Sequence, residues 1–556
     1  MKLFQKLNHK KLLLIVILII AIFLRIWDLG NVPPSASLDE ASIGYNAYSV
    51  LKTGIDEYGD FPLISQRGYD DFRRSTYLFL TIPFIKMFDL NVISVRLPAV
   101  ILSILTVWAI YYIVVLLFEK GSKYAEYIGL LTSFLLAISP WHIYISRLGH
   151  ESNAYLSFFI FGLFFFLHGI KKEKGTTIFI SMIFFLLSMV SYYSGQVFIP
   201  LFLLGLFIIF RNKLLLFFLS NRKNLIYVIS FFILFFLSLI MVFSPEALIR
   251  YKGTSALTPE AQPDKFAKSV ELRNEAVKNN NLIMAIYYNR RLFPIQVFIE
   301  EYFSHFDPRW LFINSGSESF KIPNLGLLYF WQAPFIIFGT GFILLRKEVD
   351  ANYKKLILLW FLLSAVPASI ATQAPHAMRS YNFVPVWQIF TALGLGYLFY
   401  KLRKLKLWIL SLFLLVTLFS LFTLFKNYFN NFPKEQSKSF QYGLTQAIPY
   451  VFSRQNDYNH IVLSNKDNLY QSYMFFLFHT KYDPEKYLKQ GGTLSGGFAA
   501  THKIGKYEFR PINWNSEVKK EKTLYVGNPT DFPKDIQSVT EFKNLDGNVV
   551  VVITET

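Results

Sequence analysis

Long apolar runs separated by short basic loops dominate the pattern of this chain. Eleven runs of mostly uncharged residues lie at 12–27, 92–118, 127–145, 154–169, 176–192, 197–210, 225–243, 325–345, 356–371, 381–400 and 407–425. Most approach the roughly 17 to 25 residues that a helix needs to cross a hydrocarbon core, where its backbone polar groups must pair within the helix. The pattern therefore predicts a polytopic α-helical membrane protein with about eleven transmembrane helices.

Lysine and arginine are unevenly distributed between alternate loops. Before the first run stand Lys2, Lys6, Lys10 and Lys11, and no small-residue cleavage site follows that run. The alternate loops carry Lys120, Lys123, Lys171, Lys172, Lys174, Arg211, Lys213, Arg222, Lys223, Arg346, Lys347, Lys354, Lys355, Lys401, Arg403, Lys404 and Lys406. Because basic residues favour the cytoplasmic side, we expect a retained first span with the N-terminus in the cytoplasm and the C-terminus outside. The expected location is the plasma or inner membrane.

Three long polar segments, 30–91, 244–324 and 426–556, then fall on the outer face. We expect a transmembrane domain at 1–425, with 30–91 and 244–324 as its outer loops, followed by a small extracytoplasmic α/β domain at 426–556. In the first loop, the apolar spacing at 41–52 and 76–88 predicts helices lying in the membrane interface.

The tail differs from the rest in its pattern. Short β-rich runs at 460–464, 507–512, 523–526 and 548–553 surround a helix-like stretch at 469–479. A Gly-rich stretch at 491–497, GGTLSGG, resembles a phosphate-binding loop in composition only, because it lacks the GxxxxGK[ST] spacing. We interpret it as a connecting loop.

Composition supports the membrane class and excludes others. The chain is 53% hydrophobic, above the roughly 45–50% of soluble domains. Its net charge of +19 is spread between apolar runs, so no nucleic-acid partner is expected. Zero cysteines exclude disulfides and thiolate chemistry. Isolated histidines form no HExxH-like pair, which predicts no built-in metal site and no certain cofactor, and leaves open whether a divalent cation assists.

An acidic pair, Asp39 and Glu40, follows the first run after Pro33 and Pro34. Adjacent acids on a loop are usually solvated charge. A carboxylate near interfacial helices can instead be partly desolvated and accept a proton from a hydroxyl group. The pair is therefore a candidate catalytic site.

The same loop contains Asp70, Asp71, Arg73 and Arg74 in GYDDFRRSTY. The acids could cap the expected helix at 76–88, since Asp near a helix N-terminus offsets the dipole, or act as second acids of the site. The arginines could bind lipid headgroups or the phosphate of a lipid-linked donor.

Two further outer clusters carry ionisable side chains. SPWHIYISRLGHESN follows the third run and includes Arg147, His150 and Glu151. Ionisable residues at a membrane edge indicate a functional site, in which Arg147 is a candidate for binding the donor phosphate, although its side chain could merely extend its charge towards the interface. TQAPHAMRSYNFVP lies between the ninth and tenth runs and supplies His376 and Arg379, cations suited to a phosphate leaving group.

In order, these motifs resemble the membrane glycosyltransferases of the GT-C fold, family-39 type, related to protein O-mannosyltransferases and the lipid A aminoarabinose transferase. The resemblance spans about residues 10–400 and rests on LDEASIGYNAYSVLKTGIDEYG, VRLPAV, SPWHIYISRLGHE, FDPRWLF, PNLGLLYFWQAPFIIFG and PHAMRSYNFVP. The tail is similar to the soluble domain of some bacterial members.

The resemblance implies inverting transfer of a sugar from a polyprenyl-phosphate donor to a hydroxyl acceptor on the outer face. It implies that Asp39, with Glu40 completing the pair, is the catalytic base, that Glu151 is the catalytic acid expected after the third span, and that Arg379 and His376 hold the phosphate. The chain has DDFRRSTYLFL where protein O-mannosyltransferases have an HPPL-like element, so the acceptor, whether glycan, lipid or protein, stays undetermined.

Three other classes remain open at this stage. A flippase or transporter of lipid-linked glycans would also have many spans, but no internal repeat is evident. An enzyme of the O-antigen ligase or polymerase type would use a diphosphate-linked donor and outer-loop Arg and His. A binding or scaffold protein with an outer domain is the third. The inner loops are too short for a domain that binds nucleotide sugars, which favours a lipid-linked donor.

Overall fold

The computed structural model describes residues 9–118, 124–219, 225–242, 245–313, 320–345, 349–498 and 500–556. Most of these residues are helical, and each of the eleven predicted apolar runs contains a helix. The predicted cytoplasmic charges Lys120, Lys123, Arg222, Lys223, Arg346 and Lys347 lie outside the described residues.

The chain divides into two compact units, each built from segments far apart in sequence. Unit 1 comprises Met1–Leu24, Leu102–Ile145 and Ser152–Phe422. Unit 2 comprises Arg25–Ile101, Ser146–Glu151 and Thr423–Thr556. Residues from the first outer loop and the C-terminal tail therefore fold together in unit 2.

The apolar helices account for most of unit 1. They are α1 (His9–Ile26), α4 (Val92–Leu117), α5 (Ala125–Ala137), α6 (Pro140–Ser146), α7 (Glu151–Lys172), α8 (Gly175–Ser191), α9 (Tyr193–Leu219), α10 (Leu225–Val242), α16 (Gln332–Leu345), α17 (Ala351–Ser364), α18 (Val366–Ile370), α19 (Phe383–Lys401) and α20 (Lys406–Leu424). Five of them, α1, α4, α6, α7 and α20, have part of their residues in unit 2. Between them lie α11 (Pro245–Thr254), α12 (Pro263–Lys278), α13 (Leu282–Tyr287), α14 (Phe293–Ser304) and α15 (Pro308–Phe312).

Within the described residues, six helical stretches are long and apolar enough to cross a membrane. The number becomes seven if α5 and α6, which meet at a bend of 57°, form one span. Helices α3 (Thr76–Phe88), α8 and α16 are apolar but shorter. The structure thus shows a polytopic membrane protein, whereas the predicted number of eleven spans is not established.

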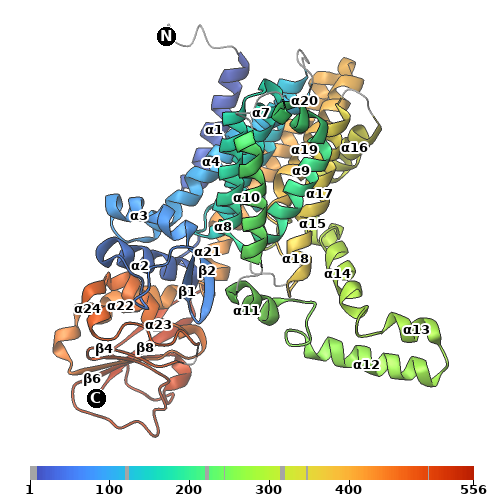
Figure 1. Cartoon of the computed structure of the whole chain (residues 1–556). Helices are drawn as coiled ribbons and strands as arrows, with labels where there is room; N and C mark the ends of the chain where they lie inside the picture. The colour runs from blue at the N-terminus through green and yellow to red at the C-terminus, as the bar shows by residue number, and fades with distance from the viewer. Residues whose placement is uncertain are drawn as a thin grey trace. The chain divides into compact units, whose positions relative to one another are not determined.

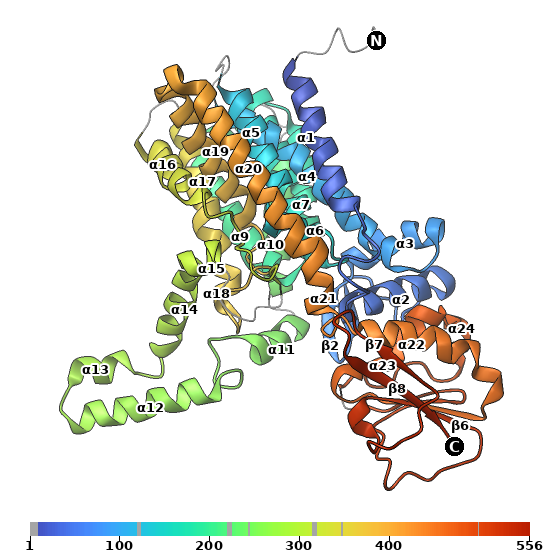
Figure 2. The same ribbon diagram turned by 180° about the vertical axis from the view of Figure 1, so that it is seen from behind.

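Helices α16 and α19 pack closely in unit 1 because glycines face the partner backbone (Figures 1 and 2). A Cβ at Gly339 would lie 1.8 Å from the carbonyl oxygen of Phe390, and one at Gly394 would lie 2.0 Å from that of Phe335. Small residues at such a contact allow two helices to approach within the membrane.

The N-terminal segment of unit 2 contains two helices and a hairpin. They are α2 (Leu38–Thr53), β1 (Ser65–Gly68), β2 (Asp71–Arg74) and α3 (Thr76–Phe88). Helices α2 and α3 lie where the apolar spacing predicts helices, at 41–52 and 76–88, and they contact each other. The antiparallel hairpin was not predicted.

The tail forms a six-stranded sheet of order β4-β5-β3-β6-β8-β7, in which β3 is parallel to both of its neighbours (Figure 1). The helices and strands of the tail are α21 (Phe432–Gln436), α22 (Tyr442–Ser453), β3 (His460–Leu463), α23 (Ser472–Thr480), α24 (Pro484–Lys489), β4 (His502–Ile504), β5 (Tyr507–Phe509), β6 (Thr523–Gly527), β7 (Thr540–Lys543) and β8 (Val549–Glu555). The predicted β-rich runs are β3, β5, β6 and β8, and the edge strands β4 and β7 were missed. Helix α23 packs against α22 and also against α2 of the first loop.

Candidate active site

Glu40 is locked in the interior of unit 2. It stands in the first turn of α2, where it forms a capping box with Ser37 by accepting the Ser37 backbone N–H at 2.8 Å. Arg96 donates to it twice, from Nε to Oε1 at 2.7 Å and from Nη2 to Oε2 at 3.1 Å. The backbone N–H of Gly149 donates to Oε1 at 2.8 Å. Each carboxylate oxygen thus accepts two hydrogen bonds, and the side chain is 1% exposed.

Arg96 extends this network to the chain that leads into α2. It donates to the backbone carbonyls of Leu29, Pro33 and Ser35 at distances between 2.6 and 3.0 Å. The ion pair between Glu40 and Arg96 therefore holds the segment 29–35, which leads into Asp39 and Glu40. Sequence reasoning quoted Arg96 inside VRLPAV without a role, although an arginine within an apolar run calls for a buried partner.

Asp39, in contrast, is accessible. Its side chain is 36% exposed, and Arg73 donates from Nη2 to Oδ1 at 2.5 Å. The second oxygen, Oδ2, lies 3.9 Å from His150 Nε2. The same ring nitrogen of His150 is 3.1 Å from Oε2 of the buried Glu151. The structure thus brings together Asp39, Arg73, His150 and Glu151, four residues from two loops.

Arg73 lies at the electrostatic centre of this group. Burial works to lower the pKa of its guanidinium, but the carboxylates of Asp39 and Glu151 more than offset this and raise the pKa overall. Arg73 therefore stays charged next to these two carboxylates. Its Nη1 is buried and has no hydrogen-bond partner among the described residues, so it is the part of the guanidinium that a ligand oxygen could use.

The β1–β2 hairpin positions Arg73 opposite Gln66. Its two-residue turn consists of Tyr69 and Asp70, both with positive φ, at 56° and 63°. This turn geometry matches the twist of paired strands. Residues 71–74 are therefore a strand and not the helix cap that the sequence allowed for Asp70 and Asp71.

The other charged residues of this loop have different surroundings. Asp70 accepts hydrogen bonds from Arg67, Ser495 and the backbone of Gly496. Asp71 is exposed and accepts the backbone N–H of Phe72 at 2.8 Å. Arg74 is buried and donates from Nη1 to Ser65 Oγ at 2.8 Å.

Arg147 is fully buried in unit 2. It donates to the carbonyl oxygens of Val32 at 2.7 Å and Asp28 at 3.3 Å. Its guanidinium also lies 4.9 Å from the ring centroid of Phe429, in the π-helical segment Phe425–Asn431. Burial lowers the pKa of this guanidinium. Arg147 is thus held by backbone carbonyls and an aromatic ring.

Unit 1 holds a separate group of cationic and aromatic side chains. His376 is buried, its ring lies 5.1 Å from that of Phe320, and its backbone N–H points at His305 Nε2 at 3.4 Å. Arg379 is half-buried and donates through its backbone N–H to His376 Nδ1 at 3.3 Å. Burial lowers the pKa of His305 to about 4, so this ring is neutral at pH 7.

Sequence reasoning missed Lys321, which belongs to the same region of unit 1. The side chain is 4% exposed and donates from Nζ to the carbonyl oxygen of Trp310 at 2.8 Å. Its ammonium lies 5.3 Å from the Trp310 ring centroid, and the His305 ring packs on the same tryptophan. The sequence offered only a weak signal for it, a lysine next to Phe320 just before the apolar run at 325–345.

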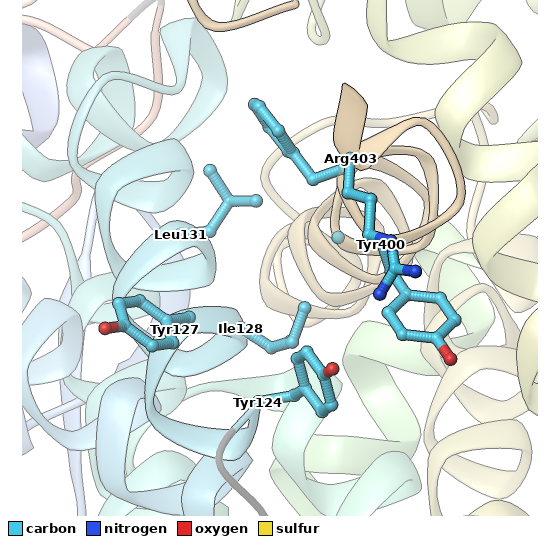
Figure 3. A pocket seen from close by; sticks show the side chains of 8 residues that line it. Tyr124, Tyr127, Ile128, Leu131, Tyr400 and Arg403 are labelled. Carbon is cyan, nitrogen blue, oxygen red and sulfur yellow. The ribbon is translucent and has the colours of Figure 1, made fainter. Parts of the chain in front are cut away.

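A pocket of about 460 Å³ lies elsewhere in unit 1, between the start of α5 and the end of α19 (Figure 3). The residues that line it are Tyr124, Tyr127, Ile128, Leu131, Gly396, Phe399, Tyr400 and Arg403. None of these eight residues is a predicted site residue or a carboxylate. In the described part of the chain, no group of three or more His, Asp or Glu side chains could hold a metal ion.

Comparison with known proteins agrees with this architecture. Residues 76–243 match the family described as dolichyl-phosphate-mannose-protein mannosyltransferase. No protein of curated function matches the chain significantly in sequence.

The solved structures that share the fold include the following two. ArnT from Cupriavidus metallidurans, solved bound to undecaprenyl phosphate, is 9% identical with a TM-score of 0.51 over 98% of this chain and 97% of that one. The archaeal oligosaccharyltransferase AglB from Archaeoglobus fulgidus, solved with an inhibitory peptide and a dolichol-phosphate, is 14% identical with a TM-score of 0.51 over 85% of this chain. The match covers 64% of the length of AglB, which is less than two thirds. This chain therefore shares the GT-C fold of these membrane proteins, and its residues 76–243 are similar to the mannosyltransferase family.

Proposed function

We propose that this protein transfers a sugar from a polyprenyl-phosphate donor to a hydroxyl acceptor on the outer face of the membrane, with inversion at the anomeric carbon. The observation that carries the proposal is the different environment of two neighbouring acids. Glu40 is saturated with hydrogen bonds, whereas Asp39 is partly exposed, ion-paired and next to His150 and Glu151.

Asp39 is the general base in this scheme. A base must be ionised before it reacts and must reach the proton that it takes. Arg73 stabilises the ionised carboxylate, and the exposed fraction of 36% leaves room for an acceptor. Glu40 cannot take this role, because Arg96, Gly149 and Ser37 occupy both of its oxygens.

The step balances without a nucleotide or an external oxidant. The acceptor oxygen attacks the anomeric carbon from the face opposite the phosphate, a new C–O bond forms, and the bond between the anomeric carbon and the phosphate oxygen breaks. The hydroxyl proton goes to Asp39, and polyprenyl phosphate leaves with the bonding electron pair. His150 lies beside the base, with its Nε2 3.9 Å from Asp39 Oδ2 and 3.1 Å from Glu151 Oε2.

Cationic donors must offset the charge that develops on the leaving phosphate. The free Nη1 of Arg73 is one such donor in unit 2. Considering unit 1 by itself, we assign Lys321, His376 and Arg379 to an anion site that takes a lipid phosphate. Support comes from the burial of Lys321 and His376 among aromatic side chains, which strengthens charge-assisted hydrogen bonds to an anion.

The test is transfer of radiolabel in proteoliposomes that contain the purified full chain. The donors are undecaprenyl-phosphate mannose, glucose and arabinose, and the acceptors are membrane lipids and proteins of the expression host. We expect Asp39→Asn to lower transfer by about 10² to 10⁴-fold, the usual contribution of a positioned base. Asp60→Asn, an exposed acid of the same loop, is the matched control and should retain activity.

Two results would contradict the proposal. One is full transfer by a folded Asp39→Asn protein. The other is label transfer from undecaprenyl-diphosphate sugars with none from any monophosphate donor, which would favour an enzyme of the O-antigen ligase type.

A further inference from the structure

The Gly-rich loop at 491–497 holds the turn of the hairpin that carries Arg73. The Asp70 carboxylate in that turn accepts a hydrogen bond from the Gly496 backbone N–H at 2.8 Å and from the Ser495 hydroxyl at 2.9 Å. Burial alone would raise the pKa of Asp70, but these bonds and the one from Arg67 lower it. The loop therefore binds the ionised turn and not a free phosphate.

Close backbone packing explains why a glycine stands at the centre of this contact. A Cβ on Gly496 would lie 2.5 Å from the Cα of Tyr69 and 2.5 Å from the Tyr58 hydroxyl. The Gly496 carbonyl oxygen accepts a hydrogen bond from Gln471 Nε2 at 2.8 Å, which fixes the loop from the side of the tail. Any side chain here would push the hairpin turn away.

A second anchor lies at the start of the same loop. The Thr493 backbone N–H donates to the carbonyl oxygen of Glu57 at 2.9 Å, and its hydroxyl donates to Glu57 Oε2 at 2.6 Å. Glu57 is fully buried and also accepts from Asn46 Nδ2 of α2 at 2.9 Å and from Tyr473 of the tail at 3.2 Å. The loop is thus attached to the first outer loop at both of its ends.

The hairpin in turn contacts Asp39 and the residue that precedes it. Arg73 of β2 donates to Asp39, and the Tyr69 hydroxyl donates to the carbonyl oxygen of Leu38, the residue before Asp39, at 2.8 Å. A displacement of the turn by the width of one methyl group would change both contacts.

We propose that Ser495 and Gly496 are positioning residues of the active site, which act through the hairpin to hold Arg73 against Asp39. The C-terminal segment is then part of the catalytic apparatus and not a separate accessory domain. This inference rests on the proposed function, in which Asp39 is the base.

The experiment compares Gly496→Ala and Ser495→Ala with Ser516→Ala, a control at an exposed serine of the same tail. Hydrogen–deuterium exchange of residues 65–74 measures how often the hairpin opens, and it requires no substrate. Radiolabel transfer from undecaprenyl-phosphate mannose, glucose or arabinose, whichever the wild type uses, reports kcat, KM and the pH profile.

We expect faster exchange of 65–74 and about tenfold lower kcat in Gly496→Ala, with KM changed less than twofold. The acidic limb of the kcat profile should move to higher pH, because Asp39 loses part of its stabilisation by Arg73. A smaller change in the same direction is expected for Ser495→Ala, and none for Ser516→Ala. A purely structural role would lower the yield of folded protein without moving the pH limb.

If Gly496→Ala fails to fold, a cycle with Ser495→Ala and Asp70→Asn decides the matter, because the two losses should not add when the residues act through one contact. Additive losses, or an unchanged hairpin and pH limb in the folded variants, would overturn the inference. An active Asp39→Asn protein would instead overturn the proposed function. The exchange data would still show whether Ser495 and Gly496 hold the hairpin in place.

Discussion

Replacing each acid of the Asp39–Glu40 pair by alanine should separate a structural from a catalytic carboxylate. Glu40→Ala removes the acceptor of four hydrogen bonds and leaves the guanidinium of Arg96, which is 0% exposed, without its counter-charge. Removal of one partner of a buried ion pair costs about 3–5 kcal/mol. Asp39→Ala breaks a pair whose carboxylate is 36% exposed, and such pairs contribute about 0–1 kcal/mol.

The assay is unfolding of both purified variants by SDS in mixed micelles, followed by circular dichroism, with Glu40→Gln as an isosteric control. We expect Glu40→Ala to lose several kcal/mol, Glu40→Gln to lose less, and Asp39→Ala to unfold like the wild type while it has lost transfer activity. Equal destabilisation by the two alanine variants would refute the assignment of different roles.

Four further outcomes follow from the structure. Burial raises the pKa of Glu57 to about 7 from 4.5, so between these values the native state keeps a proton that the unfolded state loses. The free energy of unfolding should therefore fall as pH rises from 4.5 to 7. Unfolding measured over this range should depend less on pH in Glu57→Gln. Gly339→Ala should destabilise the α16–α19 contact by about 1–3 kcal/mol in the same unfolding assay, whereas Gly341→Ala on the same helix, with open space around its Cβ, should be tolerated. Lys321→Met should lower the amount of polyprenyl phosphate that copurifies, as measured by mass spectrometry of extracted lipid. Ser516→Cys, in a chain without cysteine, should react with an impermeant maleimide on intact cells if the tail is outside.

The apolar elements could be predicted because their pattern reflects burial directly. Residues 76–88 show an apolar stretch between polar segments, and α3 has these same bounds. Strand β6, with five buried residues, gave an equally clear β signal. The edge strands β4 and β7 alternate weakly in burial, so their sequences carry little periodicity.

The hairpin could not be predicted, because its turn does not use the residues that mark such turns. Tyr69 and Asp70 adopt positive φ without Asn-Gly or Asp-Gly, and the acids read equally well as a helix cap. The long-range bonds from Ser495 and Gly496 hold this conformation. Since a contact across more than 400 residues leaves no local pattern, Arg73 could be identified as a candidate, but not as the partner of Asp39.

The separate roles of Asp39 and Glu40 follow from helix geometry. Successive residues of an α-helix point about 100° apart, so two neighbouring acids in the first turn of α2 cannot face the same partners. Glu40 turns inwards to Arg96 and also closes the capping box, while Asp39 turns towards Arg73 and solvent. Aspartate could not replace Glu40, because its carboxylate would stop one methylene short of Arg96. Two acids that are equivalent in the sequence are thus separated by the helix into one that holds the loop and one that can react.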